Sequence, residues 1–244
     1  MSEWLQNRSG YITASNLHLL MTKGRGKEQA WGDSAISYLY KVEYERFMGC
    51  PGIETDAAPL RFGRENEPYA IEWLRRNFNP YVRYYEVDFP EKPFIKVDFA
   101  KFGSTPDADI VGFNGTVEEL IEIKTTFSEK ATYTYFSPSK PYDKKRAMAL
   151  EEHIDQLIGQ LLCFPNVNVI HLLKYNPQRD SEYDIKPIDD PSRGIMFTFT
   201  REELGLAIDI RRERIIMADE YLETGFELEG INDYYRIRNE KKYN

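Results

Sequence analysis

Apolar residues recur at helical spacing in the first third of the chain. The predicted helices cover residues 12–21, 34–49 and 66–78. Thr13 or Ser15 is the candidate N-cap of the first helix, because a hydroxyl at that position accepts a bond from a free backbone N–H. Gly49 marks the end of the second helix. Pro68 is expected in the first turn of the third helix, where proline is tolerated.

In the middle of the chain the helical period gives way to short runs rich in β-branched and aromatic residues. The predicted strands cover residues 82–89, 94–103, 108–113 and 118–126. Asn114 and Gly115 form the strongest hairpin signal in the chain, since this dipeptide suits a two-residue turn. We expect these consecutive strands to form an antiparallel meander.

Helix and strand patterns alternate in the last part of the chain. The predicted elements are a helix over 148–164, strands over 167–175, 183–188 and 195–200, and a helix from Arg201 to about Glu223. In that last helix Leu204, Ile208 and Ile215 fall on one face. The sequence contains no internal repeat, low-complexity tract or long linker. We therefore expect residues 1–244 to form a single domain of the α+β or mixed α/β class.

Composition and charge limit the function classes. The chain has 244 residues, of which 41% are hydrophobic and 30% charged, and no stretch approaches the roughly 18 apolar residues that a membrane helix needs. The start of the chain lacks a secretory pattern, and two cysteines, Cys50 and Cys163, suggest no disulfide framework. A reducing cytoplasm fits best. A formal net charge of -8 argues against a nonspecific coat on nucleic acid, but leaves room for a local basic channel.

Candidate chemistry lies on the last strand of the predicted meander. Glu122 and Lys124 are two residues apart and share one face of the strand, while Ile121 and Ile123 share the other. Pairing through the Asn-Gly turn is expected to bring Asp107 beside Glu122. Two carboxylates and a backbone carbonyl form the hard-oxygen environment that suits Mg²⁺. Taken alone, the same residues are more often turn and surface charges on an ordinary hairpin.

Two helices carry further polar candidates. Glu67 begins the apolar face of its predicted helix, and a buried carboxylate needs a partner. Gln156 lies with His153 and Gln160 in a stripe at the border of an apolar face, from which an amide can reach a polar site. The alternatives are a favourable charge near a helix N-terminus for Glu67 and plain surface amides for the glutamines.

Basic residues and hydroxyls near the start of the chain suggest anion binding. Arg8 followed by Ser15 at a predicted helix start combines a cation with free backbone N–H groups. Two basic segments are candidates for DNA contact: Lys23, Arg25 and Lys27, and Lys140, Lys144, Lys145 and Arg146. Solvated surface charge is the equally frequent alternative for both segments. His18 and His171 lie in apolar runs and are interpreted as core residues.

Five segments, in this order, carry a resemblance to a known family: "NRSGYITAS", "RFGRENEPYA", "STPDAD", "IEIKTT" and "HIDQLIGQ". Together they resemble the lambda exonuclease or YqaJ-type viral recombinase family, within the PD-(D/E)xK nucleases. The resemblance runs from about Trp4 to Leu162. It implies a restriction-endonuclease-like core in which helices flank a central mixed sheet.

The resemblance also implies an activity and its partners. Members are Mg²⁺-dependent, processive 5'-to-3' exonucleases on double-stranded DNA, and they leave 3' single strands for recombination. They are commonly phage-encoded, which implies the cytoplasm of a bacterial host. They work with a single-strand annealing protein and, in the best-known member, form a ring-shaped trimer. Mn²⁺ is expected to substitute for Mg²⁺.

By motif position the resemblance assigns roles to individual residues. Asp107, Glu122 and the Ile123 carbonyl match metal ligands, and Lys124 matches the catalytic lysine. The other matched residues are Glu67 and Gln156 near the metals, and Arg8, Ser15 and, more weakly, Thr105 for the 5' phosphate of DNA. Ala108 departs from the pattern, because a glycine often follows the aspartate.

Two rival functions remain open. A restriction-like or repair endonuclease of the same superfamily uses the same chemistry and would cut a covalently closed circle. A DNA-binding module without turnover would keep the acidic cluster as structure. The sequence has no Cys or His cluster with zinc spacing, and two cysteines cannot alone ligate the iron-sulfur cluster found in some PD-(D/E)xK nucleases.

Overall fold

A computed structural model describes residues 3–24, 30–52, 57–85, 93–178 and 186–224. Its larger sheet has five strands in the order β2-β5-β6-β7-β8. These strands are β2 (Val82–Tyr84), β5 (Ala108–Val111), β6 (Val117–Thr125), β7 (Val169–Tyr175) and β8 (Gly194–Thr200). Neighbouring strands are antiparallel except β6 and β7, which are parallel. The sheet is therefore mixed, as the predicted fold class requires.

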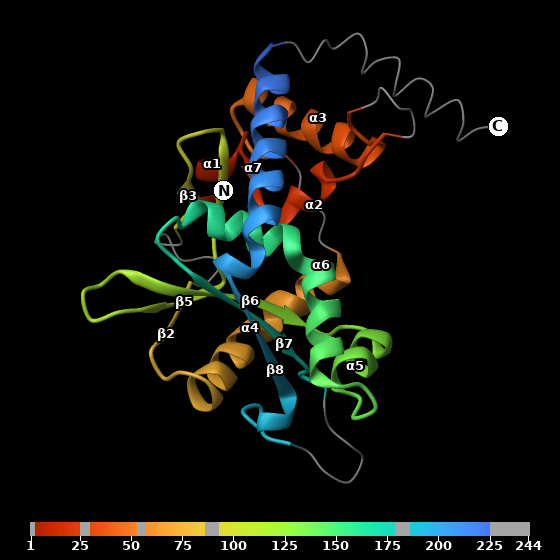
Figure 1. The fold of residues 1–244 in the computed structure, drawn as a ribbon, viewed down its shortest axis with the longest axis vertical. Coiled ribbons are helices and arrows are strands. Elements are labelled where there is room, and N and C mark those ends of the chain that lie inside the picture. Colours follow the sequence, from red (N-terminus) through yellow and green to blue (C-terminus); the bar gives the residue numbers. More distant parts are fainter. Residues whose placement is uncertain (1–2, 25–29, 53–56, 86–92, 179–185, 225–244) are drawn as a thin grey trace, which may run out of the picture.

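Two long helices cover the two faces of this sheet (Figure 1). Helix α4 (Ala58–Asn77) packs Ile71 and Leu74 against Ile121 and Ile123 of β6. Helix α6 (Tyr142–Cys163) packs on the opposite face, over Leu120 and its neighbours. Alternation along β6 therefore directs its even-numbered side chains, Glu122 and Lys124 among them, toward the α6 side of the sheet.

A smaller sheet and a group of helices lie at one end of the molecule (Figure 1). The sheet has the order β1-β4-β3, with β1 (Ile12–Thr13), β4 (Phe102–Ser104) and β3 (Ile95–Lys96). A second core joins it to α2 (Leu17–Leu20), α3 (Asp33–Met48) and α7 (Arg201–Thr224). The remaining described elements are α1 (Glu3–Arg8), α5 (Glu129–Phe136) and the short 3-10 helices η1 (Ala14–Asn16) and η2 (Pro191–Arg193).

One polar joint ties the start of the chain to its last described helix. Arg46 of α3 donates from Nε to the carbonyl of Gly10 at 2.8 Å and from Nη2 to Asp219 of α7 at 2.6 Å. The other carboxylate oxygen of Asp219 accepts the backbone N–H of Lys101 at 2.8 Å. The joint holds α3, α7, the turn after α1 and the start of β4 together.

Several predicted elements are confirmed. Gly49 follows α3 with a φ of 63°, the left-handed conformation in which a glycine commonly ends a helix. Gly115 has a φ of 81° in the β5–β6 hairpin, as the Asn-Gly signal predicts. The observed β8 and α7 agree with the predictions over 195–200 and from Arg201 to about Glu223.

The predicted helix over 12–21 is wrong in its first half. Ile12 and Thr13 pair in parallel with Phe102 and Gly103, and only residues 17–20 form α-helix. Neither Thr13 nor Ser15 caps that helix, because the residue before it is Asn16. Pairing with a strand 90 residues away in sequence decides the conformation, and a local pattern does not contain that information.

The expected meander is also wrong. β2 pairs with β5, while β3 and β4 form a hairpin that belongs to the smaller sheet. Part of the strand predicted over 82–89, and residues 183–185 of the strand predicted over 183–188, lie outside the described residues; residues 186–188 are not strand. Short amphipathic strands do not specify which edge they pair with. The expectation of one domain stays a prediction.

Two helices start earlier than predicted. Helix α4 begins at Ala58, so Pro68 lies inside it rather than in its first turn; Pro59 occupies the first turn. Helix α6 begins at Tyr142, so Lys144, Lys145 and Arg146 lie within it. The helices α1 and α5 were not predicted, because each is short and its apolar period is too brief to detect.

Candidate active site

The β5–β6 hairpin brings three sequence candidates together. Asp107 directly precedes β5, and its Oδ2 accepts the backbone N–H of Ile123 at 2.8 Å. Glu122 and Lys124 point from the same face of β6, and the Lys124 ammonium lies 2.5 Å from Glu122 Oε1. The short distance reflects a charged pair in which Glu122 is only 1% exposed.

Helix α6 supplies the remaining donors to Glu122. Gln156 Nε2 donates to Glu122 Oε1 at 2.6 Å, and Gln160 Nε2 donates to Oε2. A buried carboxylate needs such donors to replace water. The sequence placed Gln160 in the same polar stripe as Gln156, but the family resemblance assigned it no role; the structure buries it, so it is not a plain surface amide. Its Oε1 is buried and has no hydrogen-bond partner among the described residues.

Burial and charge perturb the proton affinities of this group. Burial, together with the nearby carboxylate of Asp107, raises the pKa of Glu122 to about 7, against the opposing effects of Lys124 and Gln160. Burial alone would lower the pKa of Lys124, but Glu122, Asp107 and Glu67 raise it above its ordinary value. Lys124 is therefore a permanent cation at neutral pH. Glu67 of α4 acts on it from the neighbouring helix, with its Oε1 buried.

The oxygen chemistry of this group fits a hard divalent cation. Asp107 and Glu122 are close enough for repulsion between their charges to raise the pKa of Glu122, and a cation between them would relieve that repulsion. Within the described ranges no group of three or more His, Cys, Asp or Glu side chains is arranged to hold a metal. The candidate ligands are thus two carboxylates and main-chain oxygen, with Lys124 and the glutamines bonded to Glu122.

A cavity of about 60 Å³ reaches the two glutamines of α6 that bond Glu122. Arg8, Ser15 and Thr105 line it together with Gln156 and Gln160. The two glutamines that bond Glu122 therefore also form a wall of the cavity. The volume exceeds the space that one water molecule needs, so a larger group fits.

Trp4 is a further lining residue that sequence reasoning missed. Its indole N–H donates to Thr105 Oγ1 at 3.1 Å, and the guanidinium carbon of Arg8 lies 4.6 Å from its ring centroid. The Thr105 hydroxyl in turn donates to the Pro93 carbonyl at 2.7 Å. Trp4 could have been identified from its spacing of four residues from Arg8, which places both side chains on one face of a helix.

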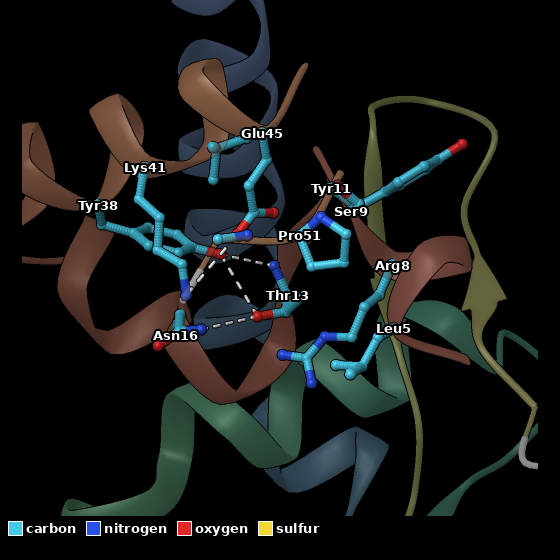
Figure 2. A pocket seen from close by; sticks show the side chains of 12 residues that line it. Leu5, Arg8, Ser9, Tyr11, Thr13, Asn16, Tyr38, Lys41, Glu45 and Pro51 are labelled. Atoms are coloured by element: carbon cyan, nitrogen blue, oxygen red, sulfur yellow. Dashed lines mark hydrogen bonds and ion pairs between the residues drawn. The ribbon is translucent and has the colours of Figure 1, made fainter. Parts of the chain in front are cut away.

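A second cavity, of about 20 Å³, shares Arg8 and Thr13 with the first (Figure 2). The backbone N–H of Thr13 donates to the Tyr38 hydroxyl at 2.9 Å, and Asn16 Nδ2 donates to Thr13 Oγ1 at 3.0 Å. Figure 2 shows these bonds converging beside Arg8. The space suffices for about one water molecule. We interpret this region as support for β1 and for the wall of the larger cavity.

A buried polar cluster lies beside Lys124 in the sheet. Lys174 of β7 is the register partner of Lys124, and its ammonium contacts Glu152 Oε2 at 3.0 Å and His153 Nε2 at 2.6 Å. It also lies 4.3 Å from the ring centroid of Tyr135. Burial and the charge of Lys174 lower the pKa of His153 to about 2, so this histidine is neutral. Sequence reasoning did not foresee this cluster.

Several other residues singled out in the sequence lie outside this site. His18 is exposed, contrary to its interpretation as a core residue, whereas His171 is 4% exposed as expected. Arg146 bonds the Thr198 carbonyl and Glu203, so its charge is committed within the fold. Lys23 is exposed, and the neighbouring Arg25 and Lys27 lie outside the described residues.

In the described part of the chain no helix is both long and apolar enough to cross a membrane.

Comparison with solved structures identifies the fold. An alkaline exonuclease, LHK-Exo, from Laribacter hongkongensis is similar with a TM-score of 0.62 and 21% identity over 99% of both chains. LHK-Exo in complex with dAMP gives a TM-score of 0.59 and 20% identity, again over 99% of both chains. A phage related exonuclease from Haemophilus somnus 129PT gives 0.60 and 16% identity, over 87% of this chain and 93% of that one. These likenesses confirm the predicted fold class.

Comparison with family models identifies the family. No curated protein matches the chain. The model of the YqaJ-like viral recombinase domain matches residues 3–163, which include every predicted site residue. The resemblance seen in the sequence is thereby confirmed, and the chain belongs to the YqaJ-like viral recombinase domain family.

Proposed function

We propose that this chain is a divalent-metal-dependent exonuclease that degrades one strand of linear duplex DNA from its 5' end and leaves 3' single strands for recombination. One observation carries the proposal. Gln156 and Gln160 bond Glu122, which together with Asp107 forms the acidic group, and the same two glutamines line the cavity that Arg8 lines. A site for phosphodiester chemistry and a site for an anionic strand end are thus adjacent. The recombinase family and the fold of exonucleases support the same function.

In this proposal Asp107, Glu122 and the Ile123 carbonyl would hold Mg²⁺, with Glu67 near a second ion. The chemistry that such a cation supplies is charge neutralisation at the phosphate and acidification of water. Lys124, kept protonated by the surrounding carboxylates, orients the attacking water and stabilises negative charge at the phosphate. Water attacks phosphorus in line with the leaving 3' oxygen. Gln156 and Gln160 fix Glu122 in place.

Arg8 is proposed to bind the terminal 5' phosphate, with Ser15 and Thr105 beside it. A guanidinium presents several N–H donors in a plane and matches a phosphate better than an ammonium does. Anchoring the strand end in the cavity holds the nearest phosphodiester at the acidic group. This positioning supplies the preference for strand ends over internal sites.

The deciding experiment compares 5'-labelled linear duplex with covalently closed circular duplex, each with and without Mg²⁺. Release of label from the linear substrate alone, only with Mg²⁺, is the expected result, and Lys124→Ala is the inactive control. Cleavage of the closed circle would instead indicate an endonuclease. Binding of both substrates without cleavage under any metal condition would indicate a non-catalytic module.

We also propose the partners that the family resemblance implies. A single-strand annealing protein would take up the 3' strand, and a homo-oligomer, expected to be a trimeric ring, would enclose the duplex. An acidic chain can follow DNA when its basic residues face an inner surface. Light scattering that shows only a monomer, together with full processivity, would rule out the need for a ring.

A further inference from the structure

Three side chains on β2, β5 and the segment after β2 form a cluster in which the guanidinium of Arg83 is held in one orientation. Arg83 donates from Nε to Asp109 Oδ1 at 2.9 Å and from Nη2 to Asp109 Oδ2 at 2.8 Å. The Tyr85 hydroxyl also donates to Asp109 Oδ2, at 2.8 Å, and the Arg83 guanidinium lies 5.1 Å from the Tyr85 ring centroid. The side chain of Asp109 is 1% exposed, whereas that of Arg83 is 45% exposed.

This cation lies on the same face of the sheet as the acidic group. Asp109 is two residues from Asp107, and its register partner in β6 is Leu120, which packs under α6. Arg83 is the register partner of Asp109 in β2. Strand geometry places the Cα of Arg83 roughly 8 Å from that of Asp107. Successive phosphates of one strand are separated by about 3.4 Å along the duplex axis and by more along the winding backbone, so a phosphate next to the one at Asp107 and Glu122 can reach Arg83.

In its bonds with the residues that the structure describes, the guanidinium keeps a donor edge for another acceptor. An arginine has five N–H donors in a rigid fork. Its contacts with Asp109 use Nε and Nη2, and the bidentate pair together with the Tyr85 ring fixes the plane of the group. A cation held in one orientation loses little conformational freedom when it binds. Such an arginine is suited to a phosphate that arrives at a defined position.

We propose that Arg83 binds a backbone phosphate of the DNA next to the phosphodiester that is cut, and that Asp109 and Tyr85 hold Arg83 in position for it. The proposal rests on the proposed function only in assuming DNA as the substrate. It adds a contact from β2, a strand that contributes no residue to the described lining of the Arg8 cavity. The strand would then be held at its end and again at a second phosphate.

The alternative is that Arg83 only neutralises the buried carboxylate of Asp109. A single Arg83→Gln substitution would leave that carboxylate without its cation and disturb the fold under either explanation. The double variant Arg83→Gln/Asp109→Asn avoids this problem. It removes one positive and one negative charge, so the net charge is unchanged, and it leaves two amides that can bond each other and Tyr85.

The experiment measures Kd for short duplexes, without metal ion so that no cleavage occurs, in which a neutral methylphosphonate replaces one phosphate at a time. With the wild-type chain, one position near the 5' end should weaken binding about ten-fold, the effect expected for one charged hydrogen-bonded contact. In the double variant the same substitution should change Kd less than two-fold. Arg76→Gln is the matched control, because Arg76 pairs with Glu72 and Asp189 from α4 on the other face of the sheet.

The proposal is supported if the double variant loses the methylphosphonate effect at one position and Arg76→Gln keeps it. Equal methylphosphonate profiles for wild type and double variant overturn it, even if overall affinity falls. Should the double variant fail to fold, Arg83→Lys is measured instead, because it keeps the charge without the planar fork. A smaller methylphosphonate effect on Kd at the sensitive position supports the proposal. An unchanged effect there overturns it. Because binding is measured without cleavage, failure of the exonuclease assay leaves this result interpretable by itself.

Discussion

In the proposed exonuclease, replacement of Arg8 by alanine should weaken a preference for 5'-phosphorylated ends. Among the hydroxyl and cationic groups that line the cavity, Arg8 brings the positive charge. The Thr105 hydroxyl already donates its proton to the Pro93 carbonyl and accepts a bond from Trp4, so it has little left to offer a phosphate. Arg8 should therefore carry most of the recognition, and Thr105→Val should have a small effect.

The size of the effect follows from the strength of hydrogen bonds to charged groups. Loss of the guanidinium should cost on the order of 1.5 to 3 kcal/mol, the range for such bonds. At about 1.4 kcal/mol per factor of ten, kcat/KM should fall roughly 10- to 100-fold on 5'-phosphorylated linear duplex. Arg8→Lys should lose less, because it keeps the charge and gives up only the planar fork.

The assay compares digestion of the same duplex with 5'-phosphate and with 5'-hydroxyl ends. The hydroxyl ends lack the dianion, so Arg8→Ala should change their rate far less. Arg76→Ala serves as control, because its ion pairs with Glu72 and Asp189 lie on the surface away from the cavity. An equal loss on both kinds of end would refute the phosphate role of Arg8 and favour the endonuclease or the non-catalytic binding function.

Four further predictions concern the acidic group and the fold. Lys124→Ala should abolish cleavage while duplex binding in a gel shift persists; cleavage near the wild-type rate would exclude Lys124 as the catalytic lysine. Asp107→Asn or Glu122→Gln should remove Mg²⁺-dependent activity and weaken Mn²⁺ binding in calorimetry, and unchanged binding in both would contradict the metal assignment. The pKa of His153 is about 2 in the folded chain and near 6.5 in the unfolded chain, so protonation favours the unfolded state as pH falls. Between pH 8 and pH 5 the free energy of unfolding of the wild type should therefore fall by about 2 kcal/mol more than that of His153→Gln. Urea titration of both chains at both pH values measures this difference, and an equal change in the two chains would contradict it. Gly159→Ala would place a methyl group 2.9 Å from backbone in η1 and should lower the unfolding free energy by about 1–3 kcal/mol; an unchanged urea midpoint would show that α6 can shift freely there.

Local pattern was sufficient for the chemistry of β6 but not for its surroundings. The two-residue period put Glu122 and Lys124 on one face, and the Asn-Gly turn put Asp107 next to them, because both relations depend on neighbours in sequence. Lys174 is beside Lys124 only because β6 and β7 are parallel and joined through two helices. A parallel crossover leaves no local signal of register, so the cluster around Lys174 could not be foreseen.

The residues of the larger cavity could be predicted only in part, because some of them come together from distant parts of the sequence. Arg8 and Ser15 were found through the sequence resemblance, whereas the contact of Trp4 with Thr105 joins residues 101 positions apart. Pro68 shows the opposite error: a local rule placed it in a first turn, but the packing of Ile71 and Leu74 against the sheet keeps α4 helical through it. Burial of an apolar face outweighed the missing hydrogen bond.

The joint around Asp219 has a consequence for when the protein can act during its synthesis. Residue 219 leaves the ribosome after every residue that lines the larger cavity, yet its carboxylate holds Arg46, which bonds the Gly10 carbonyl just after the helix that carries Arg8. Contacts of such long sequence separation form late, because a large loop must close before they can stabilise anything. We expect the larger cavity to be assembled only after α7 has been synthesised. A nascent chain would then carry the carboxylates of the β5–β6 hairpin before the cavity that we propose to bind DNA ends has formed.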